Sequence, residues 1–78
     1  MKYIIAKQNG LELPIIFPEI MNHAETANLL GFRQQDIVSA GFISSANTPT
    51  CHGRSESIGV ESRVEDSKTI GNLLNERR

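Results

Sequence analysis

The chain has 78 residues, 38% of them hydrophobic, which predicts one small folded domain spanning residues 1–78. Eight lysines and arginines against nine acidic residues give a net charge of −1. That balance argues against nucleic acid as a partner, because binding a phosphate backbone needs an excess of positive charge. A domain of this size buries only about 60% of the surface of its unfolded chain, and self-association is a common source of extra stability. A homodimer is therefore one expectation.

The single cysteine and the short hydrophobic runs bear on location. Cys51 cannot form a disulfide within the chain, which favours a reducing compartment. Hydrophobic runs such as Leu13 to Phe17 are far too short to cross a bilayer, and the N-terminal residues have a strand pattern instead of that of a signal peptide. We therefore predict a cytoplasmic protein with no membrane partner.

The start of the chain predicts a β-hairpin. Asn9-Gly10 is the dipeptide that best accepts the two positive φ angles of a type I′ turn, and alternating hydrophobic residues precede and follow it. With these two residues as the loop, Lys7 lies opposite Glu12, a favourable charge pair. The nitrogen of Pro14 then faces away from the first strand, where a further strand would find no donor. The second strand should therefore be an edge and the first strand central.

Two segments have helical patterns. In the first, Asn22 and Glu25 supply a start that resembles a capping box, and Gly31 supplies a left-handed end. In the second, Ser62 and Glu65 have capping-box spacing ahead of a hydrophobic helical pattern. The residues expected on the buried sides are Ile20, Ala24, Ala27 and Leu30 of the first helix and Val64, Ile70, Leu73 and Leu74 of the second.

The remaining segments complete the predicted fold. Residues 34–45 and 51–61 are expected to form two more strands, joined by a turn-prone loop at 46–50. The order strand, strand, helix, strand, strand, helix, with short connections, predicts an α+β fold. Its single four-stranded, mainly antiparallel sheet should carry both helices on one face. The other face would then be open to solvent.

The residues with chemical potential are few. Cys51 and His52 suggest a catalytic dyad, but adjacent side chains of a strand point to opposite faces. A zinc site would need both of them with His23, and the usual ligand spacings are absent from the sequence. His52, Arg54 and Glu56 share one strand face, where an exposed ion pair is more common than an acid–base cluster. We therefore predict no enzymatic activity, no metal and no cofactor.

The face without helices is the predicted interaction site. Its hydrophobic side chains surround a floor of serine and glycine, which lets another surface approach closely. Isolated hydrophobic side chains on an open sheet are also ordinary. The residues predicted to bind a protein partner, or a second copy of the chain, are Tyr3, Ile5, Ile16, Ile37, Ser39, Gly41, Ile43, Ser55 and Ser57.

Three segments of the C-terminal half are DIVSAGF at residues 36–42, GRSESIG at 53–59 and SRVEDS at 62–67. Together they resemble small uncharacterised proteins of bacteriophage and prophage genomes. The resemblance carries no residue role, because none of these segments is a motif with known chemistry. It implies a setting in which compact chains often occlude a host protein, anti-CRISPR and other anti-defence inhibitors included.

These observations predict a non-enzymatic protein-binding module. The resemblance implies inhibition of a host defence protein by occlusion, in the cytoplasm of the bacterial host. The alternative is a small homodimeric structural or assembly protein that uses the open sheet face as its dimer interface.

Overall fold

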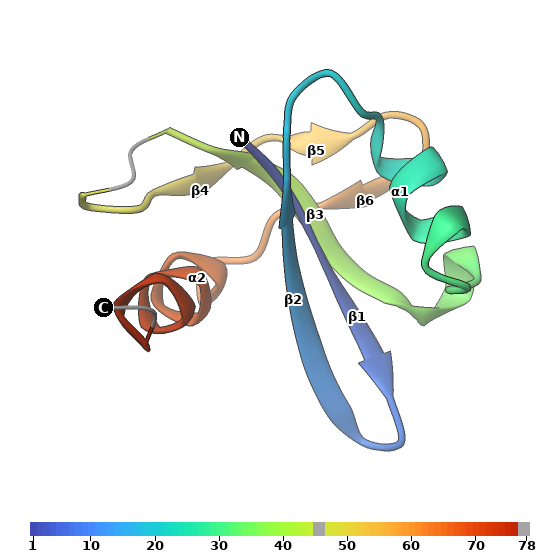
Figure 1. Cartoon of the computed structure of the whole chain (residues 1–78), viewed down its shortest axis with the longest axis horizontal. Helices are drawn as coiled ribbons and strands as arrows, with labels where there is room; N and C mark the ends of the chain where they lie inside the picture. The colour runs from blue at the N-terminus through green and yellow to red at the C-terminus, as the bar shows by residue number, and fades with distance from the viewer. Residues whose placement is uncertain (45–46, 77–78) are drawn as a thin grey trace.

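A computed structural model describes residues 1–44 and 47–76 and shows an α+β fold, as predicted (Figure 1). Residues 45 and 46, where the predicted third strand ends and the predicted loop begins, lie outside the described part. The main sheet is antiparallel, with the strand order β2-β1-β3-β4, and β5 and β6 form a separate pair. The elements are β1 (Lys2–Gln8), β2 (Leu11–Phe17), α1 (His23–Leu29), the 3₁₀ helix η1 (Gln34–Asp36), β3 (Ile37–Ile43), β4 (Cys51–His52), β5 (Arg54–Ser55), β6 (Val60–Glu61) and α2 (Asp66–Glu76).

The N-terminal hairpin has the predicted turn and register. Lys7 pairs with Glu12 across the two strands. Asn9 and Gly10 have φ angles of 54° and 80°, both positive as a type I′ turn requires. β2 lies at the edge of the sheet and β1 is central, between β2 and β3. Pro14 belongs to β2, so its predicted position in an edge strand is confirmed.

Helix α1 begins and ends where the sequence predicts. The Asn22 side chain accepts a hydrogen bond from the Glu25 backbone N–H at 2.7 Å, and Gly31 has a φ of 82°. Its predicted buried side is only partly right, because Ile20 and Leu30 are exposed. Ile20 precedes the helix and Leu30 is its C-terminal cap, so neither residue shares the helical repeat.

Helix α2 begins later than predicted. The carboxylate of Asp66 accepts the Arg63 backbone N–H at 2.8 Å, and the Asp66 N–H donates to the Arg63 carbonyl at 3.1 Å. The capping arrangement therefore uses Arg63 and Asp66, and the prediction based on Ser62 and Glu65 is wrong. Val64, predicted to be buried, precedes the helix and is 98% exposed.

The predicted strand over residues 51–61 is also wrong. Only Cys51 and His52 pair with β3. Gly53 and Gly59 then adopt φ angles of 80° and 77°, which break the extended chain into the short strands β5 and β6. The predicted third strand starts at Ile37, after the 3₁₀ turn of η1.

A β-bulge in β3 changes which face its first residue occupies. The register between β1 and β3 shifts after Ile5, so that Ala6 faces Ile37 and Val38 is the extra residue. Ile37 consequently packs in the same cluster as Ala6 and Ala40. Strict alternation from the sequence had predicted Ile37 on the opposite face.

The two helices lie on opposite sides of the main sheet (Figure 1). Ile4 packs in a cluster with Ala27 of α1, whereas Tyr3 and Ile5 pack in another with Ile70 of α2. Because adjacent residues of a strand point to opposite faces, these clusters lie on the two sides of β1. The prediction that both helices cover one face is therefore wrong.

Candidate interaction surface

The structure buries most of the residues predicted to bind a partner. Six of them are at most 6% exposed, and α2 covers the part of the face where several of these lie. The open sheet face predicted from the sequence is therefore wrong. The buried side chains are Tyr3, Ile5, Ile37, Ser39, Ile43 and Ser55; Gly41 is buried too, Ile16 is half-buried and Ser57 is exposed.

The small residues of the predicted floor serve packing within the chain. A Cβ atom at Gly41 would lie 2.5 Å from the carbonyl oxygen of His52 and 3.2 Å from Cβ of Ser62. The Ser55 hydroxyl accepts the backbone N–H of Ile58 at 3.1 Å. The close approach that glycine and serine predict is real, but it is made by the chain's own strands.

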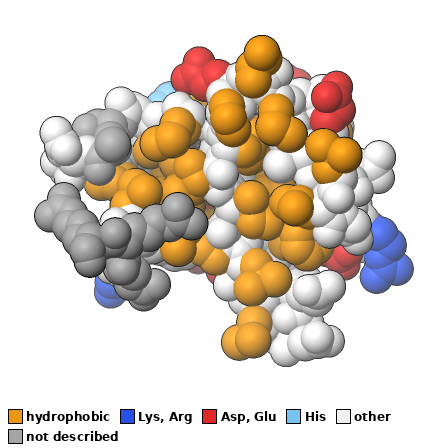
Figure 2. All heavy atoms as spheres, viewed as in Figure 1, with side chains coloured by type: hydrophobic (Ala, Val, Ile, Leu, Met, Phe, Trp, Pro, Cys, Tyr) orange, Lys and Arg blue, Asp and Glu red, His pale blue; other side chains and the backbone are white. Residues whose placement is uncertain are grey.

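Hydrophobic side chains are exposed along the edge strand β2 (Figure 2) and also at Ile20, Leu29, Leu30 and Val64 in other parts of the chain. Leu11 is 67% exposed and Leu13 is 37% exposed, both on the side of the sheet where α1 packs. Pro14, Ile15 and Ile16 of the same strand are half-buried. Exposure thus increases along β2 toward the hairpin turn.

An apolar groove of about 420 Å³ lies beside β2 on the side of α2. Pro14 and Ile16 form its β2 wall, and Leu73 and Leu74 come from the last turns of α2. Among the residues that the structure describes, all those that line the groove are hydrophobic. We call the edge strand and this groove together the β2 surface; its residues are Met1, Leu11, Leu13, Pro14, Ile15, Ile16, Leu73 and Leu74.

A buried hydrogen-bond network holds α2 against the hairpin and so fixes the groove. The hydroxyl of Tyr3 donates to Oδ2 of Asp66 at 2.6 Å, and both side chains are fully buried. Nε of Arg63 donates to Oδ1 of Asp66 at 3.1 Å. The other two guanidinium nitrogens of Arg63 donate to both carboxylate oxygens of Glu12, at 2.9 and 3.1 Å. The start of α2 is thereby tied to β1 and to β2.

The electrostatics of this network keep Tyr3, Glu12 and Arg63 in the protonation states that their hydrogen bonds require. Burial, and then the carboxylate of Asp66, raise the pKa of Tyr3, so its hydroxyl keeps the proton that it donates. The hydrogen bonds from Arg63 lower the pKa of Glu12, and the bond to Glu12 raises the pKa of Arg63. The pair between Glu12 and Arg63 therefore stays charged at neutral pH.

The residues considered for catalysis or metal binding are kept apart. Cys51 is half-buried beside the cluster that contains Tyr3, whereas His52 is exposed and stacks on Phe42, with ring centroids 6.1 Å apart. Burial raises the pKa of the Cys51 thiol. Arg54 and Glu56 form an exposed ion pair at 3.8 Å, as the sequence predicts.

Residues 1–44 and 47–76 contain no group of three or more histidine, cysteine or acidic side chains placed to hold a metal ion. No helix among them is long and apolar enough to cross a membrane. Comparison with family models, curated proteins and solved structures gave no match.

The alternation of side chains along the hairpin puts Leu11 and Leu13 on the same face as Ile4 and Ala6, which predicts that they are core residues, and their exposure was missed for that reason. The signal for it is a difference in length. A helix of seven residues is about 10 Å long, whereas a strand of seven residues is about 23 Å long. Helix α1 can therefore cover only part of β2, and the end next to the Asn9-Gly10 turn stays bare.

Proposed function

We propose that this chain is a non-enzymatic protein-binding module that contacts its partner through the β2 surface. The observation that carries the proposal is the exposure of Leu11 and Leu13 on one side of the edge strand β2, with a groove on its other side whose described lining residues are all hydrophobic. Removing such side chains from water is the main driving force of protein association. The network of Tyr3, Asp66 and Arg63 holds the groove in shape before a partner arrives, which lowers the entropy cost of binding.

The position of Pro14 bears on how a partner would bind. Edge strands commonly accept another strand through their free backbone groups. Pro14 sits in the middle of β2, where its nitrogen faces away from β1 and offers no hydrogen to a new strand. We therefore infer a contact made by side chains and the groove, instead of strand addition.

The class of partner follows from the resemblance to phage and prophage proteins. It supports a bacterial host protein as the partner, bound in the bacterial cytoplasm. Occlusion of a defence protein, in the manner of an anti-CRISPR protein, is the proposed consequence.

A homodimer through the same surface is the second candidate. The net charge of −1 produces little repulsion between two copies. A domain of 78 residues also gains stability by burying Leu11 and Leu13 against a second copy.

The test uses matched leucine-to-lysine variants of the full chain. Leu13→Lys places a charge on the β2 surface, and Leu29→Lys places the same charge on α1 at a leucine that is 76% exposed. Both variants should keep the wild-type circular dichroism spectrum, because charges at exposed positions change the free energy of unfolding by about 0.5 kcal/mol or less.

The measurements are the mass in solution by light scattering and capture of partners from a bacterial lysate. A monomer whose captured protein is lost with Leu13→Lys, and kept with Leu29→Lys, supports the first candidate. A dimer that dissociates with Leu13→Lys alone supports the second. If Leu13→Lys changes neither the mass nor the captured protein, the β2 surface is not the interface.

A further inference from the structure

His23, the first residue of α1, is buried on the side of the sheet opposite α2. Its side chain is 4% exposed, and Nε2 lies 3.0 Å from the carbonyl oxygen of Gly41 in β3. The ring makes edge contacts with Phe17 and Phe42, with centroids 5.4 and 5.6 Å away. Because a carbonyl oxygen only accepts, Nε2 carries the hydrogen and the bond is made by the neutral imidazole or the charged one alike.

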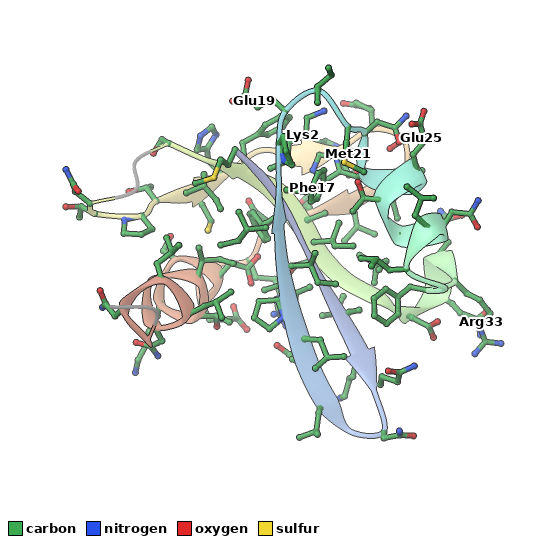
Figure 3. All side chains as sticks on the ribbon, viewed as in Figure 1. Lys2, Phe17, Glu19, Met21, Glu25 and Arg33 are labelled. Carbon is green, nitrogen blue, oxygen red and sulfur yellow. The ribbon has the colours of Figure 1, made fainter. Side chains whose placement is uncertain are left out.

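The charged group that acts on the His23 ring is a cation, Lys2. Lys2 of β1 donates from Nζ to the carbonyl of Met21 at 3.0 Å, and Nζ lies 5.9 Å from the ring centre of Phe42, which itself contacts His23. Figure 3 shows Lys2 and Met21 close to Phe17, where the loop from β2 leads into α1. A proton added to His23 would therefore meet a lysine and aromatic rings instead of a carboxylate.

The other elements around His23 do not compensate for this charge. β2 and β3 present the uncharged rings of Phe17 and Phe42, and β4 places His52 on the far side of Phe42. On the loop before α1 and in its first turn, the acidic side chains of Glu19 and Glu25 are exposed to solvent. Burial lowers the pKa of His23 and the Lys2 charge lowers it further, although the bond to the Gly41 carbonyl acts in the opposite direction.

We propose that His23 is a proton-operated latch: its neutral ring holds the start of α1 on the sheet, and protonation in mild acid releases α1 while α2 stays docked. A helix of seven residues has almost no stability of its own, so α1 depends on its docked side chains, His23, Thr26 and Ala27. The latch is independent of the β2 surface.

Tyr3, Glu12 and Arg63, which help to hold helix α2, have pKa values shifted away from the range in which His23 titrates. Its contacts to the hairpin are the bond between Tyr3 and Asp66 and the ion pair between Arg63 and Glu12. Hydrogen bonds from Arg63 lower the pKa of Glu12 below its ordinary value of 4.5. Mild acid therefore leaves this pair charged while it protonates a released histidine.

The sign of the effect follows from linkage. The pKa of His23 is lower in the folded chain than its ordinary value of 6.5, so the released state binds the proton first as the pH falls. Above that value the latch is unaffected. Below it, the equilibrium constant for release rises by up to about tenfold per pH unit until the folded state is protonated as well.

Hydrogen exchange of the full chain, followed residue by residue by NMR between pH 7.5 and 5, tests the latch. We expect the protection factors of the α1 amides to fall by up to about tenfold per pH unit below 6.5, whereas those of α2 stay constant. His23→Gln should abolish this pH dependence, because a glutamine amide can donate to the Gly41 carbonyl but cannot be protonated. The matched control, His52→Gln, should retain it.

Three results would overturn the proposal. The protection factors of the α1 amides could stay constant with pH in the wild type, they could fall with pH equally in His23→Gln, or those of α1 and α2 could fall by the same factor. If His23→Gln does not fold, the imidazole resonances of the wild type decide instead. They must show that His23 titrates below 6.5. Titration at or above that value rules out the latch.

Discussion

The two sides of the sheet hold their helices by different chemistry. On one side, α1 is held by hydrophobic contacts around Ala27 and by the imidazole of His23. On the other, α2 is held by hydrophobic contacts around Ile70 and by a buried network of phenol, carboxylate and guanidinium groups. The first arrangement is strongest when its titratable group is neutral, and the second when Glu12 and Arg63 are charged and the Tyr3 hydroxyl keeps its proton.

This difference bears on the shape of the proposed binding surface. The charged network is directional, and it fixes the start of α2 precisely enough to shape a groove with β2. Helix α1 has only seven residues and covers only part of β2, which leaves Leu11 and Leu13 in solvent. The longer helix α2 builds the groove on one side of β2, and the short helix α1 leaves the leucines exposed on the other side.

The largest expected effect comes from breaking the network on the α2 side. Asp66→Ala leaves the buried hydroxyl of Tyr3 without its acceptor, and removes the carboxylate that Arg63 contacts with its backbone N–H and with Nε. We expect a loss of about 3 kcal/mol in the free energy of unfolding, measured by urea denaturation at pH 7.

The control for this variant is Glu65→Ala. Glu65 is exposed and lies 3.9 Å from Arg63, so its removal should cost about 0.5 kcal/mol or less. Equal losses for the two variants would show that the buried network does not hold α2.

A smaller effect on the free energy of unfolding should distinguish two buried serines, Ser39 and Ser55. The Ser39 hydroxyl, on the side of α2, has no hydrogen-bond partner among the described residues, whereas the Ser55 hydroxyl accepts the N–H of Ile58. Ser39→Ala should therefore raise the free energy of unfolding by about 1 kcal/mol, and Ser55→Ala should lower it by a similar amount. Thermal denaturation of both variants checks the opposite signs. Destabilisation by Ser39→Ala would contradict the unpaired hydroxyl.

The smallest effect concerns the exposed end of the network. The bonds to Arg63 lower the pKa of Glu12 in the folded chain below its ordinary value of 4.5. The Glu12 carboxylate therefore stabilises the fold above pH 4.5, and this contribution is lost as the pH falls through the lowered pKa. Glu12→Gln should therefore be less stable than the wild type at pH 7, with a difference that shrinks below pH 4.5. Urea denaturation across this range measures it. A difference that does not change with pH would show that the ion pair contributes nothing to stability.

Much of the local structure could be predicted from the sequence. The Asn9-Gly10 turn requires two positive φ angles, and its two-residue loop leaves one register for the hairpin. Helix α1 begins after Asn22 and ends before Gly31. The hydrogen bond and the backbone conformation that set these two limits involve only near neighbours. Each of these signals acts over a few residues, so the rest of the fold could not change it.

The interaction site could not be predicted in the same way. Tyr3 and Ile5 are hydrophobic residues on the second face of a central strand, and the sequence allows that face to meet either a partner or a helix of the same chain. The bulge at Val38 moves Ile37 to the other face, and no glycine at this position of the sequence indicates a bulge. The proposed surface includes leucines whose alternation fits a core but which extend beyond the helix that would cover them.

The hairpin, its edge strand, the start and end of α1 and the α+β class could all be predicted from the amino-acid sequence, because turn geometry, the missing donor of Pro14 and helix capping are local effects. Which helix covers which face could not be predicted in this way. That choice depends on contacts such as the one between Tyr3 and Asp66, 63 residues apart in the chain, whose free energy exists only once both segments are in place. Burial of a face, and therefore the position of the remaining exposed surface, is a property of the assembled chain.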